Sequence, residues 1–181
     1  AINALSEEYG VGVVVATHSA TLPILGYYST EGGLRQRAIP FNEAIVKYVN
    51  EAKIDSVVLI AAGLKHHLKD PKCLSALLET VRILMDMGKT VYVMNGTPTF
   101  KYDVAKYAAL YSEAGRLDEI QLSRDDYEQR SMMGLELVNI LKSSGVHIIE
   151  PAPLLFRGKA VFVPFDAGGS YYYDGGHLND Y

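Results

Sequence analysis

The chain has very little cysteine, no tryptophan and no long apolar run. Its single cysteine, Cys73, cannot form a disulfide within the 181 residues. This argues against a small disulfide-held secreted scaffold and is compatible with the periplasm. No apolar stretch approaches the roughly 20 residues that a membrane-spanning helix needs. The start, AINALSEEYG, lacks the basic flank and apolar core of a signal peptide. The abrupt first and last residues lead us to expect a domain excised from a longer protein.

An excess of basic charge is also missing. Lys and Arg number 17 against 21 Asp and Glu, which gives a net charge of -4. This balance provides no electrostatic footprint for nucleic acid or for an anionic membrane surface. Hydrophobic residues make up 49% of the chain and charged residues 21%, values typical of a globular protein with a real core. The length predicts one domain, residues 1–181.

Short β-branched runs alternate with longer helical stretches. Strands are expected at residues 12–16, 54–62, 90–94, 146–151 and, as an edge strand because of Pro164, 159–165. Helices are expected at residues 40–52, 70–88 and 123–145, with Asn42, Asp70 and Ser123 as their N-caps. Strands that are apolar throughout, separated by helices, indicate a parallel sheet covered on both faces. We therefore predict an α/β fold, a three-layer α/β/α sandwich that is flavodoxin-like in outline.

In such sheets ligands bind beyond the carboxyl ends of the strands. Ser19 follows the first expected strand, where backbone N–H groups can hold an oxyanion; a plain helix cap is the alternative. Gly63 follows the second strand, where a backbone N–H can approach a substrate oxygen. The adjacent His66 and His67 do not share a helix face and have no carboxylate cluster beside them, so no metal site is expected.

The stretch YYYDGGHLNDY, residues 171–181, supplies Asp174 and His177 three positions apart. A serine nucleophile needs a base within reach, and the base needs a carboxylate to orient it. An Asp and a His on one turn meet that need. The alternative is an ordinary solvated loop, which Gly175 and Gly176 favour.

Several segments together resemble the SGNH (GDSL-like) hydrolase family. A strand ends in a serine-bearing loop at VVVATHSA, and a strand VVLIAA follows a helix FNEAIVKYV. The segments ETVRILMDMGKTVYVMNGTP and EPAPLLFRGKAVFVPFDAGGSYYYDGGHLNDY then match the family's later order. Asp174, His177 and Leu178 form the most specific match, DxxHL. The chain is most similar to the SGNH domains fused to integral-membrane acyltransferases that O-acetylate surface polysaccharides.

The resemblance implies an SGNH hydrolase fold and an O-acyl (acetyl) transferase or esterase acting on a carbohydrate, without a cofactor or metal. Ser19 would be the nucleophile, His177 the base and Asp174 the residue that orients it. The backbone N–H groups of Ser19 and Gly63 would hold the oxyanion. Candidate substrate contacts are His18, Asn95 and Lys65. The implied partners are an acylated glycan or carbohydrate acceptor and a fused or associated membrane acyltransferase domain, on the periplasmic or cell-surface side of the membrane.

The nucleophile segment departs from the family's Gly-Asp-Ser. Aligned without a gap, the family serine falls on His18; shifted by one position, it falls on Ser19. Gly32 and Gly33 are the candidates for the family's oxyanion glycine, and the loop at Gly63 lacks the family's asparagine. A second hypothesis is therefore a catalytically degenerate SGNH-fold domain that binds or positions a glycan or a partner. A third is a cytoplasmic flavodoxin-like binding domain.

Overall fold

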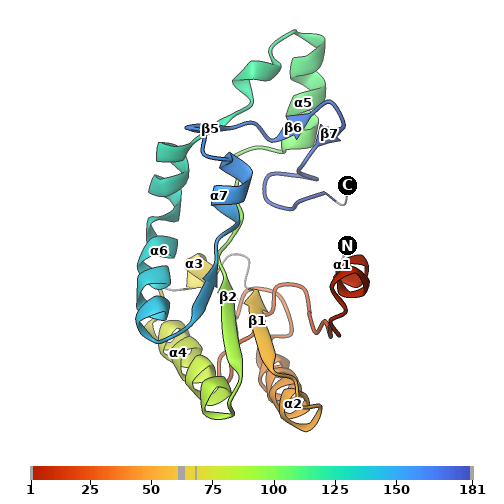
Figure 1. Ribbon diagram of the computed structural model, residues 1–181. Helices are drawn as coiled ribbons and strands as arrows, with labels where there is room; N and C mark the ends of the chain where they lie inside the picture. The colour runs from red at the N-terminus through yellow and green to blue at the C-terminus, as the bar shows by residue number, and fades with distance from the viewer. Residues whose placement is uncertain (1, 61–63, 68, 180–181) are drawn as a thin grey trace.

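A parallel sheet of three strands forms the centre of the structure, a computed structural model that describes residues 2–60, 64–67 and 69–179 (Figure 1). The strands lie in the order β1-β2-β4. They are β1 (Ser56–Ile60), β2 (Thr90–Met94) and β4 (His147–Ile149). In the register, Tyr92 lies opposite Val58 on one side and His147 on the other. The predicted parallel α/β fold is thus confirmed.

Three long helices pack against this sheet. They are α2 (Ala38–Glu51), α4 (Pro71–Asp86) and α6 (Arg124–Ser143). Their buried side chains share one core with the strands, in which Leu77, Leu84 and Leu141 are at most 1% exposed. Burial of this apolar surface is the main force that holds the helices on the sheet.

Two of the predicted helix caps are confirmed. The Asp70 carboxylate accepts a hydrogen bond from Lys72 N at 3.0 Å, and Pro71 occupies the first turn of α4. The Ser123 hydroxyl accepts one from Asp126 N at 3.0 Å and donates to the Asp126 carboxylate at 2.9 Å. Each cap satisfies a backbone donor that the first helical turn leaves free.

The prediction for Asn42 was wrong. This residue lies inside α2, which begins at Ala38, and is 4% exposed. Its amide donates to the backbone carbonyls of Leu22 and Ile24 at 2.8 and 2.9 Å. The side chain therefore satisfies buried acceptors of a neighbouring irregular segment, a long-range role that local sequence does not reveal.

The predicted buried strand at residues 12–16 is also absent. After α1 (Ile2–Tyr9), residues 11–18 have no regular secondary structure, and Val13, Val14 and Val15 are 49–59% exposed. Among the described strands, β1 pairs with β2 alone. A valine run has high β propensity, but it becomes a strand only where a neighbouring strand pairs with its backbone.

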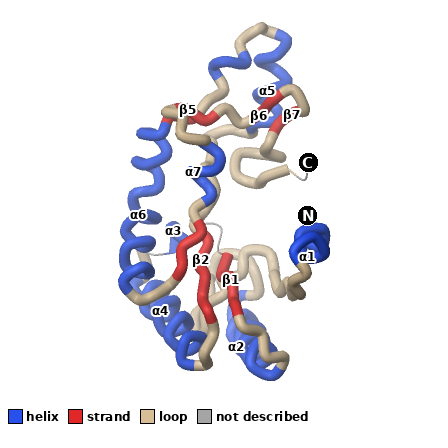
Figure 2. Tube along the Cα trace, in the orientation of Figure 1, coloured by secondary structure: helices blue, strands red, loops and turns tan. Residues whose placement is uncertain are grey.

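The remaining elements, whose arrangement Figure 2 shows, include those that pack around a second apolar core. They are η1 (Arg35–Arg37), α3 (Leu64–His67), α5 (Val104–Glu113), η2 (Leu117–Glu119), β3 (Leu122–Ser123), α7 (Pro151–Phe156), β5 (Val161–Phe162), β6 (Phe165–Asp166) and β7 (Gly169–Ser170). η1 and α3 lie outside that core, whose buried members are Val104, Ile120, Leu122, Ala152, Phe156, Phe162 and Tyr172. Pro164 separates β5 from β6, so the strand expected at residues 159–165 is two short ones. β5 pairs with β3, and β6 with β7, both antiparallel.

Candidate active site

The C-terminal tail folds back on itself as a tight loop. Tyr172 and Leu178 form an antiparallel bridge, and Tyr173 N donates to His177 O at 2.8 Å. Asn179 N donates to Tyr171 O at 2.8 Å. The DGGH stretch is the turn that these contacts close.

This turn is anchored on the segment that follows β2. Phe100 N donates to Gly175 O at 2.7 Å, and Val104 N to Asp174 O at 3.3 Å. The buried Tyr172 hydroxyl donates to the Pro98 carbonyl at 2.7 Å. Since residues 97–104 leave the carboxyl end of β2, the tail lies on the side of the sheet where ligands are expected.

Asp174 and His177 form a hydrogen-bonded pair in this turn. The carboxylate contacts Nδ1 of the imidazole at 2.8 Å. Its other oxygen accepts from the backbone N–H groups of Gly176 at 2.7 Å and His177 at 2.8 Å. These two backbone donors, followed by the imidazole, lower the pKa of the carboxyl group to about 2. The carboxylate is therefore ionised at neutral pH and its orientation is fixed.

Among the described residues, the imidazole of His177 is hydrogen-bonded at Nδ1 alone. Its side chain is 80% exposed. With Nδ1 turned to Asp174, Nε2 is left to face solvent or a reacting group. A carboxylate on one nitrogen and an open second nitrogen are what a general base requires.

The loop with Ser19 is a turn built around His18. The imidazole Nδ1 of His18 lies 3.0 Å from the Ser19 carbonyl and 3.3 Å from the Thr21 hydroxyl. Thr21 N donates to His18 O at 3.2 Å. Ala20 adopts a positive φ of 52°, which few L-residues tolerate. Ser19 itself is exposed.

A second loop packs closely on this turn. A Cβ on Gly33 would overlap the carbonyl oxygen of Ala20, and the φ of Gly33 is +63°. Leu34 N donates to the Thr21 hydroxyl at 3.1 Å. Only glycine fits this approach. Gly32 and Gly33 were both considered for the oxyanion site, and Gly33 is the one that packs closely against the Ser19 turn. A Cβ on Gly32 would lie 3.4 Å from the Ala20 side chain, which is an ordinary contact.

The structure does not join the two halves of the predicted triad by a hydrogen bond. Within the described residues, neither Ser19 nor His18 is hydrogen-bonded to His177. Gly63 lies outside the described residues, and so does the side chain of Lys65 in α3. The triad and the oxyanion contacts therefore stay predictions.

Asn95 lies directly at the carboxyl end of β2. Its backbone N–H donates to Ile149 O at 2.9 Å, and its side-chain oxygen accepts from Gly96 N at 2.9 Å. The side-chain oxygen of Asn95 is therefore engaged in a local turn with the backbone of Gly96. Its role as a substrate contact stays a prediction.

The sequence did not reveal how the tail is anchored. A Cβ on Gly175 would lie 2.8 Å from the Tyr102 carbonyl oxygen and 3.1 Å from that of Phe100. At Gly176 the nearest atom would be a methyl group of Thr99, at 3.7 Å. The two glycines look alike in the sequence, but only the first is required by close packing.

Two further properties of the described residues bear on the chemistry. No group of three or more His, Cys, Asp or Glu side chains in the described ranges is arranged to hold a metal ion. No helix among those residues is long and apolar enough to cross a membrane.

Comparisons with known proteins identify the family and the fold of the chain. A family model described as "SGNH domain (fused to AT3 domains)" matches residues 1–181. The chain belongs to this family. No curated protein matches the sequence of this SGNH domain.

The domain is similar to a solved structure of the periplasmic domain of the lipopolysaccharide acetyltransferase of Salmonella ser. Paratyphi A. The TM-score is 0.70 and the sequence identity 14%, over 98% of this chain and 70% of that one. At this identity the likeness shows the fold. It confirms the SGNH-type α/β fold that the sequence predicted.

Proposed function

We propose that this SGNH domain is an O-acyl transferase or esterase that acts on a carbohydrate through Ser19, His177 and Asp174. The observation that carries the proposal is the contact of 2.8 Å between the Asp174 carboxylate and Nδ1 of His177. The carboxylate is ionised and doubly held by backbone donors, and the imidazole is open at Nε2. A solvated turn accounts for the two backbone donors, so the proposal depends on the contact between the carboxylate and the imidazole.

The proposed reaction begins at Ser19. As its hydroxyl oxygen attacks the acyl carbonyl carbon, Nε2 of His177 takes the hydroxyl proton, and Asp174 stabilises the imidazolium. The donor's ester bond then breaks, and its alkoxide leaves with the proton from His177. A sugar hydroxyl, or water, attacks the acyl-enzyme in the same way and regenerates Ser19. The backbone N–H groups of Ser19 and Gly63 hold the oxyanion in both steps.

The substrate class comes from the family and the structural neighbour. The family's SGNH domains are described as fused to AT3 domains, and the neighbour is a lipopolysaccharide acetyltransferase domain of the periplasm. We infer that this domain, residues 1–181, works with a membrane acyltransferase partner on the extracytoplasmic side. The acceptor is a glycan, and His18, Asn95 and Lys65 are the candidate contacts to it.

The proposal is tested by the release of p-nitrophenol from p-nitrophenyl acetate. Ser19→Ala and His177→Gln are each expected to lower the rate by about 10²- to 10⁴-fold, the range of a positioned base and its nucleophile. Exposed imidazoles hydrolyse this ester weakly on their own, so His147→Gln is the matched histidine control, and Ser112→Ala the serine control. Equal rates in wild type and Ser19→Ala would refute the role of Ser19.

The degenerate binding domain is the second candidate. The observation in its favour is that His18 stands where the family serine falls in an ungapped alignment, with its Nδ1 turned to the Ser19 carbonyl. On this reading Ser19→Ala leaves ester hydrolysis unchanged, His177→Gln lowers it no more than His147→Gln does, and the protein still binds a glycan. Binding of acetylated and deacetylated oligosaccharides without turnover would support it.

A further inference from the structure

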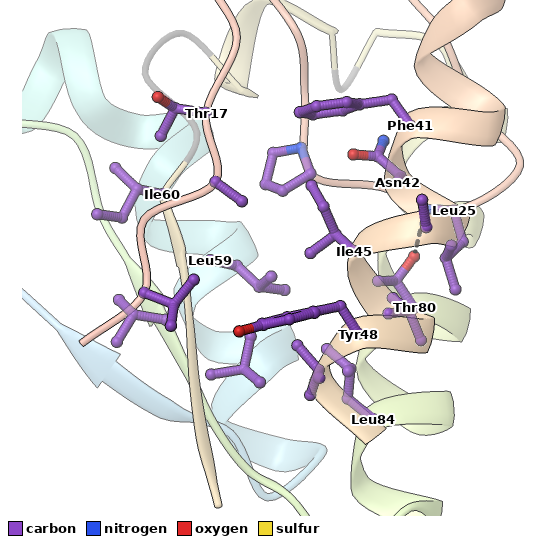
Figure 3. Close-up of a pocket in the computed structure, with 18 of the residues that line it drawn as sticks. Thr17, Leu25, Phe41, Asn42, Ile45, Tyr48, Leu59, Ile60, Thr80 and Leu84 are labelled. Carbon is purple, nitrogen blue, oxygen red and sulfur yellow. Dashed lines mark hydrogen bonds between the residues drawn. The ribbon is translucent and has the colours of Figure 1, made fainter. Parts of the chain in front are cut away.

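An apolar cavity of about 540 Å³ opens beside the loop that bears His18 (Figure 3). Its walls are the extended segment from Val14 to Thr17, the inner face of α2, and the unpaired edge of β1. Thr17 and Phe41 lie at one end, and Leu84 lies at the other. Its volume is in the range of pockets that hold small organic ligands.

The cavity exists because residues 11–18 do not join the sheet. Val14 and Ala16 line it, while Val13 and Val15 do not. This alternation is that of an extended chain, with one face turned to the cavity. The space that a paired strand would fill is therefore left open.

Two buried polar side chains in its wall, Asn42 and Thr80, are satisfied within the protein. The Asn42 amide donates to two backbone carbonyls, as described above. The Thr80 hydroxyl accepts from Leu25 N at 2.9 Å and donates to the Ala76 carbonyl at 2.7 Å. These two side chains therefore do not need a ligand as a partner. Thr17, Tyr48 and Ser56 also line the cavity, and most of the other lining residues are aliphatic or aromatic.

We propose that this cavity binds the aliphatic chain of the acyl group, an inference that rests on the proposed function. A sugar carries a hydroxyl on most of its carbons, and each would lose its hydrogen bonds to water against such walls. An alkyl chain loses none. In the proposed orientation the carbonyl end lies where Thr17 and His18 line the cavity, and Ser19 is the next residue along the chain. The domain would then accept acyl groups longer than acetyl.

The first test is direct binding of linear carboxylates to the 181-residue chain. Acetate, butanoate and hexanoate are titrated by isothermal calorimetry. Each added methylene that enters an apolar site is expected to lower Kd about fourfold. A Kd independent of chain length would overturn the inference.

Two matched pairs of variants locate the binding. Ala44→Trp places an indole in the cavity from α2, and Glu43→Trp places the same ring on the neighbouring residue, which does not line it. Val14→Trp and Val13→Trp form the equivalent pair on the opposite wall. All four positions are exposed, so the folded state should persist, which circular dichroism checks. The cavity-lining variants should lose the chain-length dependence and the controls should keep it. An unchanged dependence in both Ala44→Trp and Val14→Trp would refute the site.

The failure of this inference differs from that of the proposed function. One result would overturn the cavity inference alone: hydrolysis of acetyl esters that depends on Ser19, together with a Kd for carboxylates that does not change with chain length. Graded carboxylate binding without Ser19-dependent turnover would overturn the catalytic proposal and uphold the cavity as a site for an aliphatic chain. Binding of free glucose that is lost in Ala44→Trp would overturn the choice of an alkyl ligand.

Discussion

Replacing Gly175 with alanine tests whether the tail is anchored as described. The added methyl group would lie 2.8 Å from the Tyr102 carbonyl oxygen and 3.1 Å from that of Phe100. Both neighbours are backbone atoms, which cannot swing aside. The turn must therefore move away, and this weakens the hydrogen bond from Phe100 N to Gly175 O.

Overpacking of this kind costs about 1–3 kcal/mol. For a chain of this size each kcal/mol lowers Tm by about 2–4 °C. Because Gly175 is next to Asp174, the displacement should also lower esterase activity. Thermal unfolding by differential scanning calorimetry and p-nitrophenyl acetate hydrolysis measure the two effects.

Gly176→Ala is the matched control. The new methyl group would meet only a Thr99 methyl at 3.7 Å, an ordinary contact, and the backbone N–H that binds Asp174 is retained. Neither glycine has a positive φ, so the lower entropy of the unfolded chain should leave Gly176→Ala neutral or slightly more stable. Equal losses of Tm in the two variants would refute the packing described for the tail.

Four further outcomes are expected. In His177→Gln, the pKa of the Asp174 carboxyl group, measured by NMR, should rise from about 2 but stay below its ordinary value. The reason is that the two backbone donors lower this pKa more than the imidazole does. A return to the ordinary value would show that the imidazole is the main cause of the lowered pKa. Because folding lowers this pKa, the carboxylate stabilises the folded state above pH about 4, and this contribution is lost as pH falls through about 2. Asn42→Leu should lower the free energy of unfolding by about 1–3 kcal/mol, because two buried carbonyls lose their donor; an unchanged urea midpoint would contradict this. Tyr172→Phe should cost about 0.5–1.5 kcal/mol through the bond to Pro98, and no change in the same urea titration would show that bond to be dispensable.

The sequence predicted the parts of this fold that depend on local chemistry. Asp70 and Ser123 cap helices as their positions suggested, because a cap needs only a side chain and the next few backbone donors. The apolar runs at β1, β2 and β4 became parallel strands, and the helices between them provide the crossover connections that parallel strands need.

The sequence failed where the outcome depends on distant partners. The valine run at residues 12–16 has the composition of a strand but gains no paired neighbour. Asn42 resembles a cap but holds two carbonyls about 20 positions earlier in the chain. Tertiary contacts decide whether the valine run pairs as a strand and where the Asn42 side chain binds, and a local sequence pattern does not contain these contacts.

In the candidate site, too, the local contacts could be predicted from the sequence and the long-range contacts could not. Asp174 and His177 were predictable as a pair because one turn contains both residues. Their attachment to the segment after β2 was not, because it joins residues more than 70 positions apart. The approach of Gly33 to Ala20 likewise has no local signature beyond two adjacent glycines.

Labelling with a fluorophosphonate, which reacts with activated serines, tests the central claim most directly. The account predicts one label per chain, mapped by peptide mass spectrometry to Ser19 and lost in His177→Gln. Ser112→Ala should label as wild type does. No label in the wild type, a label on another serine, or equal labelling of Ser19 without His177 would contradict the proposed catalytic site.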